Sequence, residues 1–539
     1  MKKLIIFLVV VSFFSCKNMQ KNDIKEKLAK FKPIEIKWDG ANLEPWEREV
    51  LNEISKVEPL IDELFLIQVH KKNIEWLNSI KDPEVKEYFL INFGPWDRLE
   101  ENKPFWGISV KPKGASFYPE DMSKEEFESF VKDLSEEEQK EFKSYFTVIV
   151  REGRKLKAVP YSIYYENYLK KLSEILNKAA ELSENQSLKK FLKSRAESFL
   201  SNDYFQSDMD WMDVKDTNLE ITLGPYETYE DELLGLKASF EAFVGIINRE
   251  ETEKLKFVEE HLKELDGNLP YPKDFKGVQK GLSSPIKVVD LVFSAGDTKA
   301  GIQTIAFNLP NDERVVAQKG SKKVMLKNVI EAKYEAILTP ISNILLEPEI
   351  QRFVSRDAFF NEVLFHEVSH GLGPGIIYLP DGKETTVRES LKDLYSFMEE
   401  AKADVASLYL IDYLVENKKL PSIFKEESPA TYLASLFRSL RFGIGEAHGK
   451  GVLLQFNWLY EKGAILRSQE GRYILNLEKF KEGMKTLLEK IIHLQARGDW
   501  QGVKELSEKY TNPPEFLIKD LEKLKDIPVD IKPVYSYKF

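Results

Sequence analysis

The sequence predicts an α+β fold that is mostly helical, with a small β-barrel or sheet in the middle of the chain. Its 539 residues suffice for about three or four domains or for two large lobes. Hydrophobic residues make up 42% of the chain and charged residues 31%, which is typical of folded proteins and excludes disordered and collagen-like chains. No Ser/Gly-rich linker separates clean domains, so we expect the segments of the lobes to interleave along the chain.

The first 16 residues, MKKLIIFLVVVSFFSC, resemble a signal peptide. Two lysines precede an apolar run from Leu4 to Phe14, which is much shorter than the roughly 20 apolar residues that a membrane-spanning helix needs. Cys16, the single cysteine of the chain, follows a small residue at the end of this run, as in the lipobox of bacterial lipoproteins. We therefore expect Cys16 to carry a lipid that anchors the protein at the bacterial cell envelope, facing the periplasm or the outside. An ordinary secretory signal with a stray cysteine is the alternative.

Helical periodicity dominates on both sides of the central region. From 45 to 200, and again from about 320 to 510, apolar residues recur at spacings of three and four, which is typical of helices that pack through one face. Between about 205 and 310 the chain contains short β-type runs separated by Gly and Pro, and these predict the small sheet or barrel. Pro-rich segments after 510 predict an extended C-terminal tail.

Charge and cysteine content exclude several kinds of function. The chain has 78 lysines and arginines against 89 aspartates and glutamates, so its net charge of −11 has the wrong sign for binding nucleic acid or anionic lipid through charge alone. One cysteine allows no intrachain disulfide, no Cys-rich zinc site and no iron–sulfur cluster. We therefore expect no nucleic-acid partner, and contact with a membrane only through a lipid on Cys16.

The segment HEVSH places His366 and His370 four residues apart, with Glu367 directly after the first histidine. On a helix, residues four apart lie on one face about one turn apart, so both imidazoles can reach one metal ion. Apolar neighbours predict a half-buried helix, which Gly371 ends directly after the second histidine. The pattern predicts a zinc site with Glu367 as the general base. Two histidines that only pack on a half-buried helix are the alternative.

A catalytic zinc ion needs a third protein ligand and an open position for water. We expect that ligand in SLKDLYSFMEEAKADVASLYLIDYL, where Glu399, Glu400 and Asp404 interrupt an apolar helical stripe. With Glu400 as the ligand, Asp404 lies one turn further on and can accept the N–H of a ligating imidazole, which fixes the tautomer and orientation of the ring. Glu399 is a candidate for the same role, or it belongs to a solvated acidic face.

At these residues the sequence resembles the dipeptidyl peptidase III family of zinc metallopeptidases, and the resemblance covers roughly residues 200 to 520. EEAKAD matches the second motif of the family and puts its metal-binding glutamate at Glu400. Three further segments match family blocks: NLEITLGPYETYEDELLG, FNLPND and GEAHGKGVLLQ. The resemblance implies two lobes around a cleft, one zinc ion per chain and peptides as substrates. We expect the protein to be a monomer.

The resemblance also assigns roles to individual residues. It places Glu220, Asn308 and Asn311 at the amino end and backbone of the bound peptide, and His448 at the oxyanion. The best-known members carry one more residue in the metal motif, HExxxH, whereas HExxH is expected of bacterial members and of the plant branch fused to a Nudix domain. They also have an arginine where this chain has Val452. No Nudix signature precedes the metallopeptidase region, so the sequence does not indicate nucleotide hydrolysis.

The family fold predicts how the interleaved segments divide between the two lobes. The signal peptide takes residues 1–16. The lobe with helices and the small sheet or barrel is expected to contain residues 17–240, 291–335 and 510–539. The helical lobe that binds zinc is expected to contain residues 241–290 and 336–509.

We predict a zinc-dependent exopeptidase that removes dipeptides from the amino end of peptides. Glu367 accepts the proton of the attacking water, His448 stabilises the oxyanion, and Glu220 binds the free ammonium group of the peptide. Two alternatives remain open. One is a thermolysin-like endopeptidase, which shares HExxH and a downstream glutamate, and the other is a non-catalytic or weakly catalytic zinc-containing lipoprotein that binds peptides.

Overall fold

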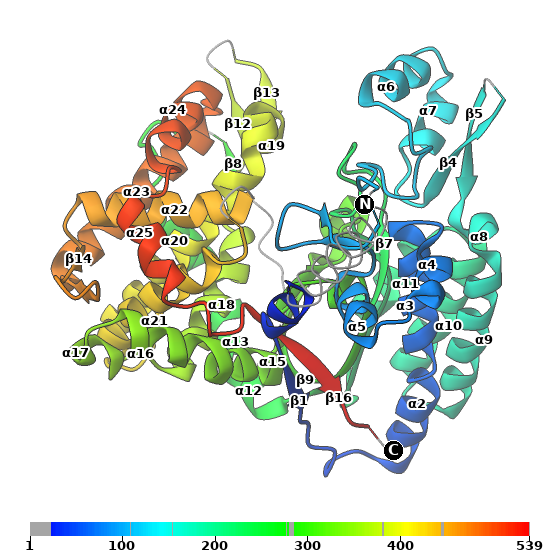
Figure 1. Ribbon diagram of the computed structural model, residues 1–539, viewed down its shortest axis with the longest axis horizontal. Coiled ribbons are helices and arrows are strands. Elements are labelled where there is room, and N and C mark those ends of the chain that lie inside the picture. The colour runs from blue at the N-terminus through cyan, green and yellow to red at the C-terminus, as the bar shows by residue number, and fades with distance from the viewer. Residues whose placement is uncertain are drawn as a thin grey trace, which may run out of the picture.

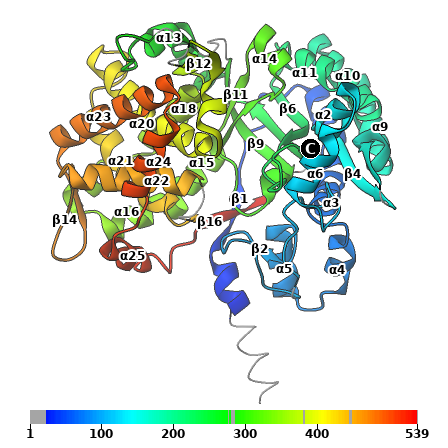
Figure 2. The same ribbon diagram turned by 90° about the horizontal axis from the view of Figure 1, so that it is seen from above.

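Two lobes lie side by side in the computed structural model, with a β-sheet between them (Figures 1 and 2). The structure describes residues 23–537, except for 108, 154, 276, 280–284, 380–381 and 444–446. Cys16 and the rest of the expected signal peptide lie outside the described residues. Among the described residues, no helix is both long and apolar enough to cross a membrane. Helices make up most of both lobes, so the predicted mostly helical α+β class with two lobes is confirmed.

In the N-terminal lobe, α2, α3, α8 and α11 pack against the helix pair α9 and α10. Its helices are α2 (Pro45–Ile54), α3 (Val57–Val69), α4 (Asn73–Ser79), α5 (Pro83–Asn92), α6 (Lys124–Lys132), α7 (Glu136–Lys143), α8 (Tyr161–Tyr164), α9 (Glu166–Leu182), α10 (Gln186–Ser201) and α11 (Phe205–Met212). Two short hairpins join them, β2 (Trp96–Asp97) with β3 (Lys103–Pro104) and β4 (Thr147–Glu152) with β5 (Lys155–Pro160). Along α9, Leu169, Leu172 and Leu176 are buried at the helical spacing that the sequence predicts. α10 begins after Asn185, whose side chain caps the helix by accepting a hydrogen bond from the backbone.

The sheet between the lobes has five strands in the order β10-β11-β9-β7-β6. The sequence predicted either a small barrel or a sheet, and the structure has an open sheet. The strands are β6 (Leu219–Glu227), β7 (Ser239–Ile247), β9 (Ile286–Gly296), β10 (Ala306–Leu309) and β11 (Lys322–Leu326). All neighbouring strands run antiparallel except β9 and β11, which are parallel. α3 packs against β7 and β9, whereas α18 (Arg356–His370) packs against β10 and β11. The sheet therefore connects the two lobes.

The structure corrects the predicted boundary between residues 240 and 241, which falls inside β7. β7 pairs with β6 along its length, so residues 241–247 belong to the sheet. Residues 286–290 likewise form the first part of β9. The segment between these strands does lie with the helical lobe, because Asn268 at the end of α13 (Lys256–Gly267) accepts a hydrogen bond from the hydroxyl of Tyr409. β7 also pairs with β9, on the far side of the segment 248–285, and the composition of the chain does not reveal such a long-range pairing.

The C-terminal lobe packs its helices around α20, which is buried along most of its length. Its helices are α12 (Arg249–Lys254), α13, α15 (Lys327–Lys333), α16 (Thr339–Leu345), α17 (Pro348–Gln351), α18, α19 (Val387–Leu391), α20 (Tyr395–Glu416), α21 (Phe424–Ser439), α22 (Ala447–Glu461), α23 (Leu477–Arg497), α24 (Trp500–Tyr510) and α25 (Glu515–Glu522), with a π-helical turn η2 (Tyr334–Leu338) and a 3-10 turn η3 (Lys392–Leu394). The strands β8 (Val278–Gln279), β12 (Pro374–Tyr378) and β13 (Glu384–Thr386) form a small sheet, and β14 (Ile465–Arg467) pairs with β15 (Tyr473–Leu475). α20 contacts α18, α21, α22 and α23. Ala401, Ala403 and Ala406 of α20 are fully buried, which allows this close packing.

The two ends of the described chain meet between the lobes. β1 (Phe31–Ile36) and β16 (Asp530–Tyr535) pair in parallel. The segment before β16 is not the extended tail that the proline content predicted, because it contains α25. Asp520 of α25 forms an ion pair with Arg467, and the backbone carbonyls of 524, 527 and 528 accept hydrogen bonds from Arg441. These contacts hold α25 against the helical lobe, whereas the prediction placed all of 510–539 in the other lobe.

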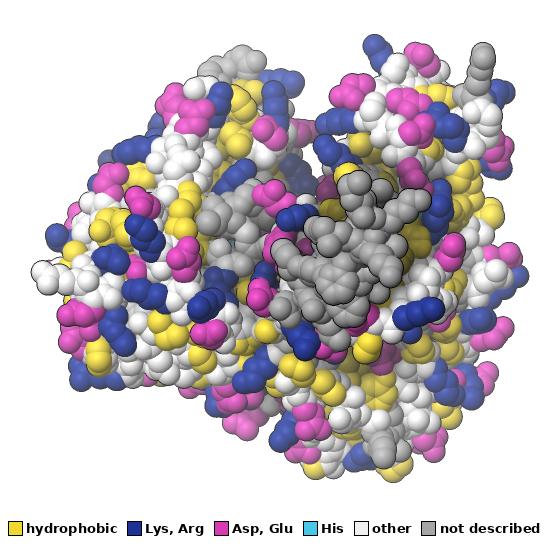
Figure 3. Space-filling model, viewed as in Figure 1, with side chains coloured by type: hydrophobic (Ala, Val, Ile, Leu, Met, Phe, Trp, Pro, Cys, Tyr) yellow, Lys and Arg dark blue, Asp and Glu magenta, His cyan; other side chains and the backbone are white. Residues whose placement is uncertain are grey.

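The space-filling view shows a hollow between the upper parts of the two lobes (Figure 3). On this face, basic and acidic side chains are mixed, and neither sign of charge covers a large continuous area.

Candidate metal centre

α18 brings the two histidines of HEVSH onto one face of the helix. The hydroxyl of Ser355 caps the first turn by accepting a hydrogen bond from the backbone N–H of Ala358 at 3.1 Å. Leu364, Phe365 and Val368 are buried on faces that point away from the histidines, so the helix is anchored by its apolar residues. The helix ends at His370, as the glycine after it predicts.

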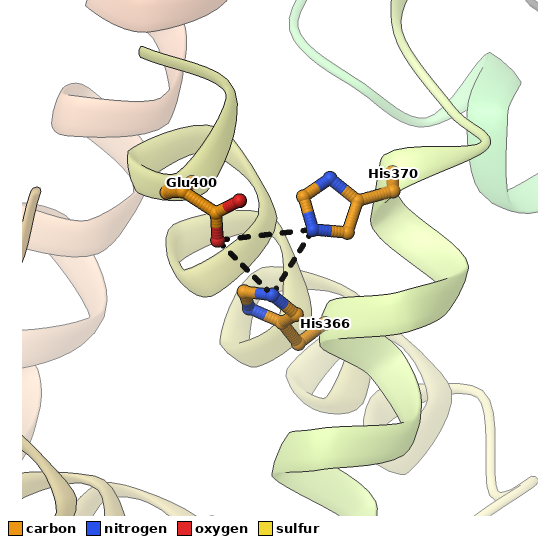
Figure 4. A group of neighbouring side chains, drawn as sticks. All are labelled: His366, His370 and Glu400. Atoms are coloured by element: carbon orange, nitrogen blue, oxygen red, sulfur yellow. Dashed lines mark hydrogen bonds and ion pairs between the residues drawn. The ribbon is translucent and has the colours of Figure 1, made fainter. Parts of the chain in front are cut away.

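His366, His370 and Glu400 lie together between α18 and α20 (Figure 4). The Nε2 atoms of the two imidazoles are 3.1 Å apart. Oε2 of Glu400 lies 3.5 Å from Nε2 of His366 and 3.9 Å from Nε2 of His370. The three residues predicted to be metal ligands are therefore brought together, and they come from two neighbouring helices as expected.

The donor set and its spacing fit a zinc ion. Zinc takes imidazole nitrogens and carboxylate oxygens at about 2.0–2.1 Å, and a tetrahedral arrangement then separates the donor atoms by about 3.3–3.4 Å. The three distances given above bracket this value. Three protein donors also leave the fourth position of a tetrahedron for water, which is typical of catalytic zinc sites.

Each imidazole presents its second ring nitrogen to a carboxylate of α20. Nδ1 of His366 lies 2.7 Å from Oδ1 of Asp404, and Nδ1 of His370 lies 3.3 Å from Oε1 of Glu399. A carboxylate in this position accepts the N–H of the ring and leaves Nε2 free to bind a metal. The structure thus places Asp404 and Glu399 where the proposed orienting role requires them, and Glu399 is buried rather than part of a solvated face.

The electrostatics of this group favour a positive charge between the donors. Burial opposes protonation of His366, but hydrogen bonds to Asp404 and Glu400 outweigh burial and raise its pKa well above the usual range. Burial likewise works against ionisation of Glu400, yet the nearby His370, His366 and His448 hold the pKa of this carboxyl well below its usual range. Glu400 is therefore an anion at neutral pH, as a metal ligand must be.

Glu367 and His448 both lie at the edge of this group. Glu367 is partly exposed beside the two histidines on α18. Nδ1 of His448, from α22, lies 3.1 Å from Oε2 of Glu400, and the His448 side chain is 42% exposed. Burial lowers the pKa of His448, but the hydrogen bond to Glu400 outweighs it and the net shift is upward. A protonated His448 can donate a hydrogen bond to a substrate in front of the metal group.

The structure contradicts the assignment of Glu220 to the amino end of the substrate. Glu220 lies in β6 and is only 3% exposed. Its carboxylate accepts a hydrogen bond from the indole N–H of Trp211 at 2.8 Å and forms an ion pair with Lys322 at 3.1 Å. Both partners are themselves buried. This carboxylate is therefore part of the interior of the sheet, where a peptide cannot reach it.

Glu227, seven residues further along the same block, is the carboxylate of β6 whose charge interacts with Glu367. It ends β6, is partly exposed and lies close enough to Glu367 for the two charges to interact. Burial raises the pKa of Glu227 to about 7, against a hydrogen bond from Asn311. The sequence held a usable signal, because an acid at the end of a predicted strand is more accessible than one in its buried middle.

Of the two predicted asparagines, Asn308 in β10 and Asn311 after it, Asn311 is hydrogen-bonded to Glu227. Asn311 donates a hydrogen bond from Nδ2 to the backbone carbonyl of Tyr226 at 3.0 Å and is otherwise exposed. Oδ1 of Asn308 accepts a hydrogen bond from the hydroxyl of Ser321 at 2.6 Å. Tyr229, which belongs to the same matched block but has no role assigned from the sequence, is 79% exposed, and its hydroxyl interacts electrostatically with Glu227, Glu367 and Glu400.

Val452, at the position where the best-known family members have an arginine, does not reach the site. It lies one turn after His448 in α22 but is buried in the hydrophobic core. Lys450 is exposed two residues earlier.

Comparisons with known proteins point to one family. A model described as "Peptidase family M49" matches residues 113–384, which include HEVSH. The protein named "Nudix hydrolase 3" of Arabidopsis thaliana is 38% identical, over 95% of this chain and 74% of that protein. "Dipeptidyl peptidase 3" of Dictyostelium discoideum is 24% identical over 59% of this chain, and the match spans 48% of that protein.

Two solved structures are similar over nearly their whole length. The dipeptidyl peptidase III of Caldithrix abyssi is 47% identical with a TM-score of 0.91, and the match covers 95% of this chain and 99% of that one. The dipeptidyl-peptidase III of Corallococcus sp. strain EGB is 41% identical with a TM-score of 0.87, and the match covers 95% and 96% of the two chains.

Proposed function

We propose that this chain, which belongs to peptidase family M49 and is a metallopeptidase, uses zinc to remove dipeptides from the amino end of peptides. The observation that carries the proposal is the group of His366, His370 and Glu400, with donor atoms spaced as zinc requires and Glu367 beside them. The similarity to two dipeptidyl peptidase III structures supports the dipeptide specificity.

The residues of this chain divide the chemistry between them. Zinc in such a site supplies Lewis acidity that lowers the pKa of water towards about 7. Glu367 accepts the proton of the attacking water and delivers it to the leaving amine. His448 donates a hydrogen bond to the oxyanion of the tetrahedral intermediate. Both side chains face the substrate from the helical lobe, on α18 and α22.

Removal of two residues requires a group that recognises the free amino end of the peptide. Glu227 is the carboxylate we assign to this role, because it ends β6 and its charge interacts with that of Glu367 beside the two histidines. Its carboxylate can bind the ammonium group by charge and hydrogen bonds. Asn311 forms a hydrogen bond with Glu227, and the exposed Tyr229 interacts with it electrostatically. Together with Asn308 of β10, these side chains can bind the backbone of the first residues.

The proposal is tested by metal content and product masses. The wild type should contain about one zinc ion per chain and should release dipeptides in sequence from a free-amine peptide, as read by mass spectrometry. Glu367→Gln should keep the zinc and lose about two to four orders of magnitude in rate. Asp357→Asn, an exposed acid on the first turn of the same helix, is the matched control and should behave as the wild type.

Internal cleavage products would favour the endopeptidase alternative. Zinc binding without release of any product would favour the peptide-binding alternative. The lipid anchor on Cys16, the location at the cell envelope and the monomeric state remain predictions from the sequence, and mass spectrometry of the membrane-extracted protein tests the first of them.

A further inference from the structure

We propose that Gln455 and Gln495 are positioning residues that hold the two orienting carboxylates and thereby set the affinity of the metal group. Their roles rest on the zinc site proposed above. The two glutamines come from different helices, α22 and α23, and neither touches the donor atoms. Each donates a hydrogen bond to the carboxylate oxygen that faces away from the imidazole.

Behind His366, hydrogen bonds connect Asp404, Gln455 and Tyr432 in a continuous series. Oδ1 of Asp404 lies at the imidazole, and Oδ2 of Asp404 accepts a hydrogen bond from Nε2 of Gln455 at 2.9 Å. The amide oxygen of Gln455 in turn accepts a hydrogen bond from the hydroxyl of Tyr432. Gln455 and Tyr432 are buried, at 0% and 1% exposed. The tyrosine hydroxyl thus keeps the NH₂ group of Gln455 directed at Asp404, and both carboxylate oxygens have a partner.

Behind His370, Glu399 and Gln495 form a similar series, but here the positively charged Lys402 also contacts the carboxylate. Oε2 of Glu399 accepts a hydrogen bond from Nε2 of Gln495 at 3.2 Å. Oε1 of Glu399, the oxygen at the imidazole, also accepts a hydrogen bond from Nζ of Lys402 at 2.8 Å. The amide oxygen of Gln495 is buried without a hydrogen-bond partner among the residues that the structure describes, so none of them holds this amide as Tyr432 holds that of Gln455.

The different surroundings of the two carboxylates predict which glutamine has the larger effect on metal affinity. The amide of Gln455 is neutral, so its hydrogen bond to one oxygen of Asp404 does not offset the negative charge of that carboxylate. The charged Asp404 therefore acts fully on His366 and makes the imidazole a better donor to a metal. Behind His370, Lys402 already orients Glu399 and offsets its charge. The hydrogen bond from Gln495 to Glu399 is also longer than the one from Gln455 to Asp404. Loss of Gln455 should therefore weaken metal binding more than loss of Gln495.

The experiment measures the zinc affinity of the full chain by competition with a chelator. Gln455→Met, which keeps the length of the side chain but removes its hydrogen bonds, should lower the affinity by about 10- to 100-fold. Gln495→Met should lower it by less. Gln501→Met, an exposed glutamine on α24, is the matched control and should leave the affinity unchanged. The absorption spectrum of the Co²⁺-loaded protein gives a second readout, which should change for Gln455→Met and stay as in the wild type for the control.

Two further results keep the outcome interpretable. Tyr432→Phe removes one hydroxyl without opening a cavity, so it should fold even where Gln455→Met does not, and it should shift the affinity in the same direction by a smaller amount. Wild-type affinity and an unchanged Co²⁺ spectrum in folded Gln455→Met, or in Tyr432→Phe where the former fails to fold, would overturn the proposal while leaving the proposed function intact. Absence of zinc binding in the wild type would overturn both.

Discussion

Replacing Glu227 by glutamine should remove recognition of the free amino end while keeping the shape of the site. Glu227 lies at the end of β6, where it interacts with Glu367 across the site. Glutamine has the same size and can still form neutral hydrogen bonds, so the change isolates the charge of the carboxylate. The substitution should act on the binding of a free-amine peptide and leave the metal group unchanged.

The size of the effect follows from the environment of Glu227. Burial raises the pKa of Glu227 to about 7, and a bound ammonium group favours the ionised form. A hydrogen bond to a charged group in a partly buried site contributes about 1.5–3 kcal/mol. At about 1.4 kcal/mol per factor of ten, kcat/KM for a free-amine peptide should fall by about 10- to 150-fold.

The assay compares kcat/KM for a peptide with a free amino end and for its N-acetylated form. Wild type should prefer the free-amine form, and Glu227→Gln should lose most of that preference. The preference of the wild type should also fall as the pH drops below about 7, because protonation removes the charge of Glu227. Glu349→Gln, an exposed acid of α17 in the helical lobe, is the control for the change of charge.

An N-acetylated peptide cleaved by wild type as fast as its free-amine form would refute recognition of the amino end altogether. A Glu227→Gln variant that keeps the full wild-type preference would show that another group binds the ammonium.

Three other predictions concern catalysis and stability. His448→Ala should lower the rate of dipeptide release by about two to three orders of magnitude, because it removes a hydrogen-bond donor to the oxyanion. The zinc content of this variant should match that of the wild type, and loss of the metal would contradict this role. Burial, together with the neighbouring Glu230, raises the pKa of Asp297 from 3.8 to about 7, so its ionisation costs the folded state stability as the pH rises through this range. In urea unfolding, Asp297→Asn should therefore gain stability relative to the wild type between pH 4 and 7 and hold that gain above about pH 7, and a difference independent of pH would count against it. Lys333 and Asp530 form an ion pair of 2.9 Å with both side chains 0% exposed, so Lys333→Met should lower the free energy of unfolding by about 3–5 kcal/mol, with a smaller loss when Asp530→Asn is added. A loss below about 1 kcal/mol for the single variant would contradict this.

Local spacing made the metal motif predictable from the sequence. The positions of His366 and His370 on one helical face depend only on the geometry of a single helix, as does the step from Glu400 to Asp404. Their side chains were therefore expected in the arrangement that the structure shows. That α18 and α20 lie against each other was inferred from the chemistry of zinc, and the packing of two apolar helix faces brings it about.

The substrate side of the site could not be read in the same way. Glu220 and Glu227 stand in one matched block, and choosing between them requires knowing which part of β6 is covered by Trp211 and Lys322. The lobe boundaries failed for the same reason, since β7 and β9 pair with each other across a long helical insertion.

By itself, then, the sequence determined the metal-binding helix, the chemistry of its donors and the helical character of the chain, because each depends on residues within one or two turns. Tertiary structure alone decided which glutamate of β6 interacts with Glu367 and which glutamines hold the orienting carboxylates. These choices depend on contacts between segments far apart in the chain, and such contacts form only when buried faces pack in three dimensions.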